Sequence, residues 1–198
     1  MTAGDPKAFA PEFERAMRAT PPGERKFVLV GILNRHLRGR RKAVLVGGAA
    51  VELYTAGAYV TGDVDLVAER EEVVSLLEGA GFQRMDRLFF REDLELAVDI
   101  VGSTLRPGVR ITTLTVGGYE VQVVSVEDAI VDRLLAAKFW KSRTDWEQAG
   151  LLWEAHGADV DLEELRTKAH ANDIMDRLDE LLARASEGQA DGTASGTR

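Results

Sequence analysis

The chain has 198 residues, enough for one large domain or for an α/β domain with a helical appendage. It contains no cysteine, which excludes disulfide scaffolds, thiolate zinc sites and cysteine nucleophiles. The net charge of −8 counts against a pure nucleic-acid-binding module, because it creates no overall field that attracts phosphates. The apolar runs are far shorter than the roughly 20 residues of a membrane span, and the N-terminal residues lack the apolar segment of a signal peptide. We therefore expect a cytoplasmic protein.

Two helices are expected in a lead-in of residues 1–40. Phe9, Phe13 and Met17 recur at helical spacing and so lie on one face of the first helix. After a turn rich in proline, residues 24–38 have the pattern of a second, more buried helix. The basic residues in 35–42 favour two interpretations: cations that stabilise the C-terminus of this helix, or a contact with RNA or phosphate.

Residues 41–125 have the pattern of a small α/β core. An apolar strand at 43–46 leads into Gly47-Gly48. A helix at 49–56, a strand at 59–67 and a helix at 69–79 are expected to follow. Further strands are expected at 82–85, 88–91 and 94–101, and a hairpin joins 111–116 to 119–124. So few crossover helices indicate an α+β protein with a small mixed sheet, in contrast to a doubly wound parallel fold.

The remainder of the chain is expected to be helical. Helices at 126–141, 144–156, 161–171 and 173–186 form a C-terminal helical domain of residues 126–186. Residues 187–198 are small and polar, which predicts a disordered tail. The helical domain contains three tryptophans, whose rings can stack on bases but whose spacing favours packing between helices: Trp140, Trp146 and Trp153.

The glycine pair Gly47-Gly48 is the first candidate binding feature. A strand that enters two glycines and then a helix lets backbone N–H groups approach an anion, and the N-terminus of a helix favours negative charge. The same pattern is also that of an ordinary tight turn. It supports a phosphate site only in combination with other residues.

Three aspartates supply that combination. Asp63 and Asp65 are expected on one face of a strand at roughly 6–7 Å separation, where two carboxylates repel unless a cation lies between them. Asp99 lies in an apolar strand, where an unpaired charge is costly. Oxygen ligands of this kind suit one or two Mg²⁺ ions. The alternatives are a solvated strand edge for the pair, and for Asp99 a bond to the backbone or to an arginine.

The order of these motifs resembles the DNA polymerase β-like nucleotidyltransferase superfamily. In that order a strand leads into a glycine pair and a helix, D-x-D follows, and one further aspartate comes later in the chain. The likeness covers about residues 41–101, and within the superfamily it is nearest to small bacterial AbiEii-type and related uncharacterised nucleotidyltransferases. It implies that Gly47 and Gly48 hold a nucleoside triphosphate and that Asp63, Asp65 and Asp99 bind metal. It also implies that Asp99 helps to deprotonate the acceptor hydroxyl. Where relatives often have serine after the first glycine, this chain has Gly48.

Lys138 is a further candidate for nucleotide binding. It lies on or near the apolar stripe of its helix, where a lysine can reach phosphates as a mobile point charge. The alternative is that its stem covers apolar surface while its ammonium group stays in water.

The leading hypothesis is a Mg²⁺-dependent nucleotidyltransferase that moves a nucleoside monophosphate from an NTP, such as ATP, to an acceptor hydroxyl. The acceptor is an RNA or tRNA end, a protein side chain or a small molecule, and the resemblance adds a role as a toxin with an antitoxin partner. The second hypothesis is a non-catalytic module that keeps the fold and senses a nucleotide or binds a partner.

Overall fold

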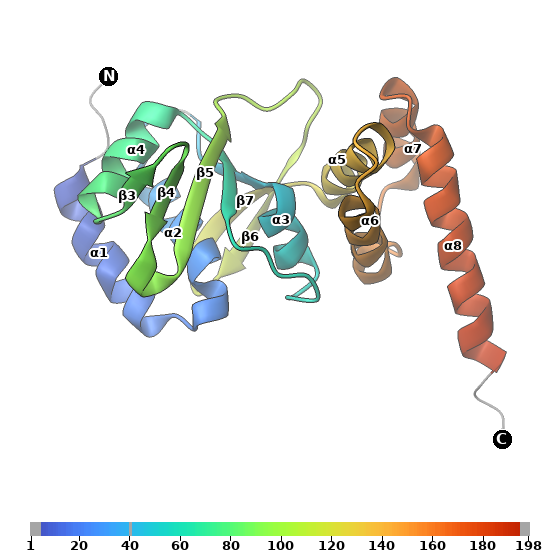
Figure 1. Ribbon diagram of the computed structural model, residues 1–198, viewed down its shortest axis with the longest axis horizontal. Coiled ribbons are helices and arrows are strands. Elements are labelled where there is room, and N and C mark those ends of the chain that lie inside the picture. The colour runs from blue at the N-terminus through green and yellow to red at the C-terminus, as the bar shows by residue number, and fades with distance from the viewer. Residues whose placement is uncertain (1–4, 40, 195–198) are drawn as a thin grey trace. The chain divides into compact units, whose positions relative to one another are not determined.

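The computed structural model describes residues 5–39 and 41–194, with side chains described as far as residue 187. The chain divides into two compact units, which Figure 1 displays in one ribbon. The first contains Met1–Leu53 and Val60–Ser125, and the second contains Tyr54–Tyr59 and Val126–Arg198. We call them the sheet unit and the helical unit.

The sheet unit is built on a seven-stranded mixed sheet with the strand order β3-β4-β5-β2-β1-β7-β6 (Figure 1). The strands are β1 (Val44–Val46), β2 (Val64–Val67), β3 (Gln83–Met85), β4 (Leu88–Arg91), β5 (Leu96–Gly102), β6 (Ile111–Val116) and β7 (Tyr119–Val124). The pairs β2–β5 and β1–β7 are parallel, whereas β1–β2, β3–β4, β4–β5 and β6–β7 are antiparallel. The mixed sheet expected from the sequence is confirmed.

The strand expected at residues 59–67 is shorter in the structure, because β2 begins only at Val64. The backbone N–H of Thr61 donates to the carboxylate of Glu52 at 2.8 Å, so this residue is bound to a helix and not to a neighbouring strand. Val60, expected to share the buried face of the strand, is 69% exposed. The prediction of a strand is therefore wrong for residues 59–63, and Asp63 precedes β2.

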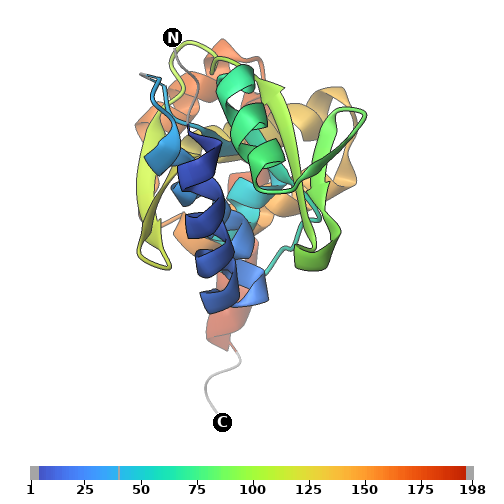
Figure 2. The same cartoon turned by 90° about the vertical axis from the view of Figure 1, so that its left-hand side faces the viewer.

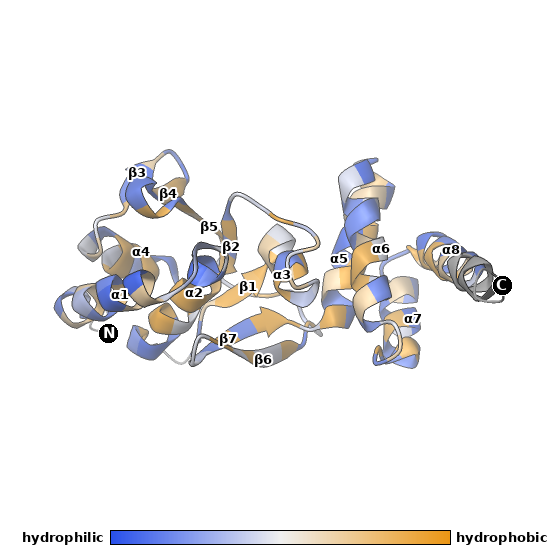
Figure 3. Ribbon diagram, turned by 90° about the horizontal axis from the view of Figure 1, so that it is seen from below, coloured by the Kyte–Doolittle hydropathy of each residue, from blue (hydrophilic) through white to orange (hydrophobic). Residues whose placement is uncertain are grey.

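Helices α1 (Pro6–Ala19), α2 (Arg25–His36) and α4 (Arg70–Gly79) pack as a layer beside the sheet (Figure 2). α1 packs against α2 and α4, and α2 packs against β7. The expected stripe of Phe9, Phe13 and Met17 is fully buried, which confirms the first helix. Apolar strands such as β1 carry the hydrophobic colour in Figure 3, and burial of this surface is the main driving force for the unit.

Three of the basic residues in 35–42 have defined contacts in the sheet unit. Lys42 donates from Nζ to the carbonyl oxygens of Asn34 at 2.7 Å and Leu37 at 2.8 Å, which have no partner within the last turn of a helix. Arg35 and His36 each lie against Glu12 of α1. The helix-terminus interpretation is therefore supported for Lys42, whereas Arg35 and His36 join α2 to α1. Arg40 lies outside the described residues.

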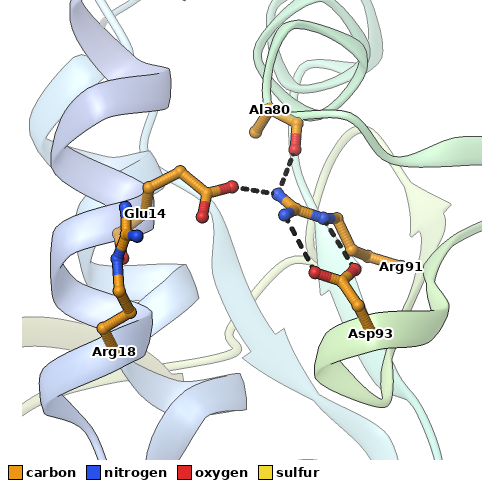
Figure 4. Close-up of polar contacts among 5 residues, drawn as sticks. All are labelled: Glu14, Arg18, Ala80, Arg91 and Asp93. Atoms are coloured by element: carbon orange, nitrogen blue, oxygen red, sulfur yellow. Dashed lines mark hydrogen bonds and ion pairs between the residues drawn. The ribbon is translucent and has the colours of Figure 1, made fainter.

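Arg91, the last residue of β4, connects the sheet to the helices (Figure 4). Its guanidinium group is ion-paired with Glu14 of α1 and with Asp93, and it donates to the carbonyl oxygen of Ala80 just after α4. One side chain thus joins β4, α1 and α4, and its own surface is mostly buried.

The helical unit contains α5 (Val126–Phe139), α6 (Arg143–His156), α7 (Leu162–Ala171) and α8 (Met175–Ala194). α5 packs against the other three helices. The segment Tyr54–Tyr59 belongs to this unit, since the carbonyl oxygen of Tyr54 lies 2.8 Å from Nε2 of His156 and the two rings meet edge to face. None of the described helices is both long and apolar enough to cross a membrane.

The end of α8 differs from the expected tail at residues 187–198. The helix continues to Ala194, and no proline interrupts the segment. The rest of the expected tail, residues 195–198, lies outside the described part of the chain.

We predict that Arg91→Ala lowers the free energy of unfolding of the sheet unit by about 1–3 kcal/mol, because it leaves Glu14 and the Ala80 carbonyl without this charged donor. Arg143→Ala is the control: Arg143 is highly exposed and pairs with Glu147 one helical turn away, so its loss should leave the free energy of unfolding nearly unchanged. Calorimetry is the suitable measurement, because all three tryptophans lie in the helical unit. Equal losses for the two variants would show that Arg91 does not hold the helices to the sheet.

Candidate functional site

Gly47 forms the turn between β1 and α3 (Gly47–Tyr54). Its φ of +65° is a conformation that residues with a side chain rarely adopt. A Cβ atom built on Gly47 would lie only 2.1 Å from Oδ2 of Asp65, which fills that space. Glycine is therefore required here for two reasons, its backbone conformation and the approach of Asp65. The turn also presents the N-terminus of α3, where unpaired N–H groups favour an anion.

Asp65 and Asp99 are brought together by the register of the sheet. They are Cα partners on the parallel strands β2 and β5, and neighbouring strands lie about 4.8 Å apart. Val46, the last residue of β1, is the partner of Asp65 on the other side. Residues in register point to the same face, so both carboxylates lie on the face of the sheet beside the Gly47 turn.

Asp63 lies two residues before Asp65 in the chain and is held by a different contact. It lies just before β2, and the hydroxyl of Thr61 donates to its Oδ1 at 2.9 Å. Thr61 is itself fixed by a buried ion pair: Lys26 of α2 donates to Glu52 of α3 at 2.7 Å and to the carbonyl oxygen of Thr61 at 2.8 Å. The loop that positions Asp63 is thus anchored to two helices.

The ion pair between Lys26 and Glu52 was not predicted from the sequence. Its signal is Glu52, a charged residue in the otherwise small and apolar segment 49–56, where a buried carboxylate needs a cation. No pattern near Glu52 identifies Lys26 as the partner, because the two residues are far apart in the chain.

Asp99 has an arginine partner. Its carboxylate is only 4% exposed, and its Oδ2 lies 3.0 Å from Nε of Arg87, whose side chain is 75% exposed. Arg87 lies in the turn between β3 and β4, directly before Leu88, the register partner of Asp99. In this structure Asp99 is thus paired with an arginine, which is one of the interpretations that the sequence left open.

The donor set fits a magnesium ion by its chemistry. Within residues 5–39 and 41–194, no group of three or more histidine, cysteine, aspartate or glutamate side chains is arranged as a metal cage. Mg²⁺ is usually held by one or two carboxylates together with water and substrate phosphates, so a complete cage is not needed. The register partners Asp65 and Asp99 have hard carboxylate oxygens of the kind that this ion prefers.

An open cavity of about 390 Å³ lies on the same face of the sheet. Val44 and Val67 line it, and they occupy the same strand face as Val46 and Asp65 because alternate residues of a strand point the same way. Polar groups line it as well: Arg41, Lys42, Ser103, Thr104 and Gln122. Asp65, Asp99 and Gly47 do not line this cavity, which lies toward the end of β1 and β2 where Val44 pairs with Val67.

Lys138 belongs to the helical unit and is bound there. Its ammonium group donates to the carbonyl oxygen of Asp173 and to Oδ1 of Asp176 at 2.9 Å, which links α5 to the start of α8. The hydrogen bond with Asp176 raises the pKa of Lys138 above its usual value and lowers the pKa of Asp176. Lys138 is therefore charged at neutral pH and has a structural partner.

Trp140 differs from the expectation that the tryptophans are packed. It lies just after α5 and is 82% exposed, because Lys141, at a φ of +54°, turns the chain before α6 begins. Trp146 and Trp153 are partly buried in α6. Packing between helices is thus the wrong interpretation for Trp140.

No protein-family model matches this sequence, and no curated protein matches it significantly. Among solved structures, the chain is similar to an antigenic nucleotidyltransferase-like protein from Paracoccidioides brasiliensis, with a TM-score of 0.54 and 19% identity over 78% of this chain and 89% of that one. It is also similar to the antibiotic-resistance factor ANT(2'')-Ia, with a TM-score of 0.46 and 18% identity over 73% of this chain and 88% of that one. The first of these two likenesses shows that the chain has a nucleotidyltransferase-like fold. The likeness to AbiEii-type proteins stays a prediction.

We predict that Gly47→Ala destabilises the sheet unit by about 2–4 kcal/mol, because it adds both backbone strain and a collision with Asp65. Gly118→Ala is a matched control, since Gly118 has a φ of +80° but no atom near the added Cβ. It should cost only the backbone term, about 1–2 kcal/mol. Calorimetry of both variants, and of Gly47→Ala combined with Asp65→Ala, separates the two terms. If removing Asp65 does not reduce the cost at Gly47, the collision is not its cause.

Proposed function

We propose that the protein is a Mg²⁺-dependent nucleotidyltransferase that moves a nucleoside monophosphate from an NTP to an acceptor hydroxyl. The observation that carries this proposal is the register of Asp65 with Asp99 beside the Gly47 turn. Two carboxylates on one face favour a cation between them, and the adjacent helix N-terminus favours an anion. A triphosphate with its metal has both charges. The nucleotidyltransferase-like fold supports the same reaction class without fixing the substrates.

The residues would divide the work as follows. The N–H groups at Gly47 and Gly48 bind phosphate oxygens, and Asp63, Asp65 and Asp99 hold one or two Mg²⁺ ions. A bound ion of this kind neutralises charge on the triphosphate and on the leaving pyrophosphate. Asp99, which lies deepest, accepts the proton of the acceptor hydroxyl. The acceptor oxygen forms its bond to the α-phosphorus while the bond to pyrophosphate breaks.

The acceptor is proposed to lie in the open cavity that Val44 and Val67 line on the same strand face as Asp65. Its volume of about 390 Å³ is within the range of about 300–1,000 Å³ that small-molecule sites occupy. This favours a small molecule or a single terminal nucleotide of an RNA over a folded protein surface. An RNA or tRNA end, a protein side chain and a small molecule are the three acceptors to compare, and a toxin role with an antitoxin partner belongs to the same proposal.

A second candidate is a non-catalytic module that binds a nucleotide or a partner. The ion pair between Asp99 and Arg87 favours it, because the deepest carboxylate is already neutralised. The two candidates differ in one measurement. Both predict that Mg²⁺ with an NTP raises the melting temperature, but only the transferase releases pyrophosphate.

We predict that Asp65→Asn lowers nucleotidyl transfer by at least about a hundredfold, since the site loses a charge that acts in the transition state. The melting temperature without metal should stay equal or rise slightly, because one of two neighbouring carboxylates is neutralised and the shape of the side chain is kept. The assay combines each labelled NTP, Mg²⁺ and either total RNA, cell protein or small-molecule extract, and follows both label and pyrophosphate.

Asp159→Asn is the control for this experiment, because Asp159 is an exposed aspartate of the helical unit. It should transfer label at the wild-type rate. Wild-type turnover by Asp65→Asn would remove Asp65 from the reaction, and a large loss of stability would identify it as a structural residue.

Lys138 is proposed to bind phosphate, and its contact with Asp176 allows a paired test. If Lys138 binds the nucleotide, Lys138→Ala should weaken NTP binding by about tenfold to a hundredfold, whereas Asp176→Ala frees the lysine and should not weaken it. If Lys138 only links α5 to α8, both variants should destabilise the helical unit alike and leave the dissociation constant unchanged. Calorimetric titration of NTP with Mg²⁺ distinguishes the two outcomes.

A further inference from the structure

The β3–β4 turn places an exposed cation directly against the deepest carboxylate of the candidate site. Nε of Arg87 lies 3.0 Å from Oδ2 of Asp99, and the sheet register places Leu88, Asp99 and Asp65 side by side across β4, β5 and β2. The turn that carries Arg87 therefore ends at the level of the acidic pair. No other ion pair of Asp99 occurs in the described part of the chain.

The two partners differ greatly in exposure, and this difference makes the pair easy to exchange. The Asp99 carboxylate is almost fully buried, so it is strongly stabilised by any cation beside it. The Arg87 side chain is 75% exposed and gives up little buried surface when it moves away. A cation that replaces Arg87 at Asp99 thus keeps the buried charge compensated, while the guanidinium group stays on a turn at the edge of the site.

The phosphates of a bound nucleotide are a suitable partner for the displaced guanidinium group. Arginine presents a planar set of N–H donors that match the oxygens of phosphate in pairs. A nucleotide bound at the Gly47 turn would bring its triphosphate to the neighbourhood of Asp65, the register partner of Asp99. The same arginine can therefore compensate the carboxylate before binding and the phosphates after it.

We propose that Arg87 is a phosphate-binding residue that pairs with Asp99 in the free protein and moves to the triphosphate when a divalent cation and an NTP bind. This inference rests on the proposed nucleotidyltransferase function. The charges balance in both states: Asp99 exchanges a guanidinium group for the metal, and the guanidinium group exchanges a carboxylate for phosphate oxygens. In the free protein, Arg87 competes with the metal ion for Asp99. The metal ion therefore binds more readily once the phosphates of a nucleotide are present to bind the guanidinium group, and in this way Arg87 influences the order of binding.

The test measures binding and not only turnover. Mn²⁺ is titrated into the nucleotide-free protein and followed by paramagnetic resonance, and a non-hydrolysable NTP analogue is then titrated with saturating Mg²⁺ by calorimetry. For Arg87→Ala, the Mn²⁺ affinity should rise by about threefold to tenfold, because a competing cation is gone. The affinity for the NTP analogue should fall by about tenfold to a hundredfold, because a charged phosphate contact is gone.

Two further variants make the result specific. Arg143→Ala removes another highly exposed arginine, which pairs with Glu147 in the helical unit, so it controls for net charge and should match the wild type in both titrations. Arg87→Lys keeps the charge but loses the paired donors, so it should lose less NTP affinity than Arg87→Ala. Melting temperatures establish that each variant is folded.

The failures of the two proposals differ. A wild-type protein that binds neither Mn²⁺ nor the NTP analogue overturns the proposed function itself. A wild-type protein that binds both, with either affinity unchanged in Arg87→Ala, overturns only the role of Arg87. A fall in NTP affinity that Arg143→Ala reproduces would assign the effect to net charge and would overturn it as well.

Discussion

The candidate site depends on the close contact between the Gly47 turn and Asp65. The carboxylate of Asp65 occupies the space that a side chain at Gly47 would need, so β1 and β2 can pair in this register only with glycine at the end of β1. The separate register of β2 with β5 places Asp99 beside Asp65. The absent side chain at Gly47 thus lets Asp65 come close to the N-terminus of α3, and the second pairing adds the other carboxylate. The rest of the site, including the loop before Asp63 and the β3–β4 turn, is arranged around this point.

The sequence predicted the parts of the site that depend on local signals. A glycine pair at the end of an apolar strand identifies a turn with a positive φ, and Gly47 has one. A single charge inside an apolar run identifies a residue that needs a partner, and Asp99 is such a residue. The mixed sheet followed from the few crossover helices between strands, and the buried face of α1 followed from the spacing of its aromatic residues.

The parts that were not predicted depend on contacts between distant segments. Residues 59–63 have the apolar and β-branched composition of a strand, but the bonds from Thr61 to Glu52 and Lys26 hold them in a loop. Arg87 is an ordinary turn residue in the sequence, and only the pairing of β4 with β5 gives it Asp99 as a partner. In each case the structure depends on a contact with a residue far along the chain. The spacing of apolar residues in the sequence does not reveal such contacts.

The segment Tyr54–Tyr59 has a consequence for the modularity of the protein. The chain passes from one unit to the other after Leu53, after Tyr59 and after Ser125, so neither unit is a continuous stretch of sequence. Tyr54 meets His156, and the chain then runs on directly to Thr61 and Asp63. A protein cut at Ser125 would keep every strand but would leave this segment without the residues that hold it. The helical unit is therefore not an accessory that recombination can exchange freely, because part of its fold is encoded within the segment that leads to the acidic residues.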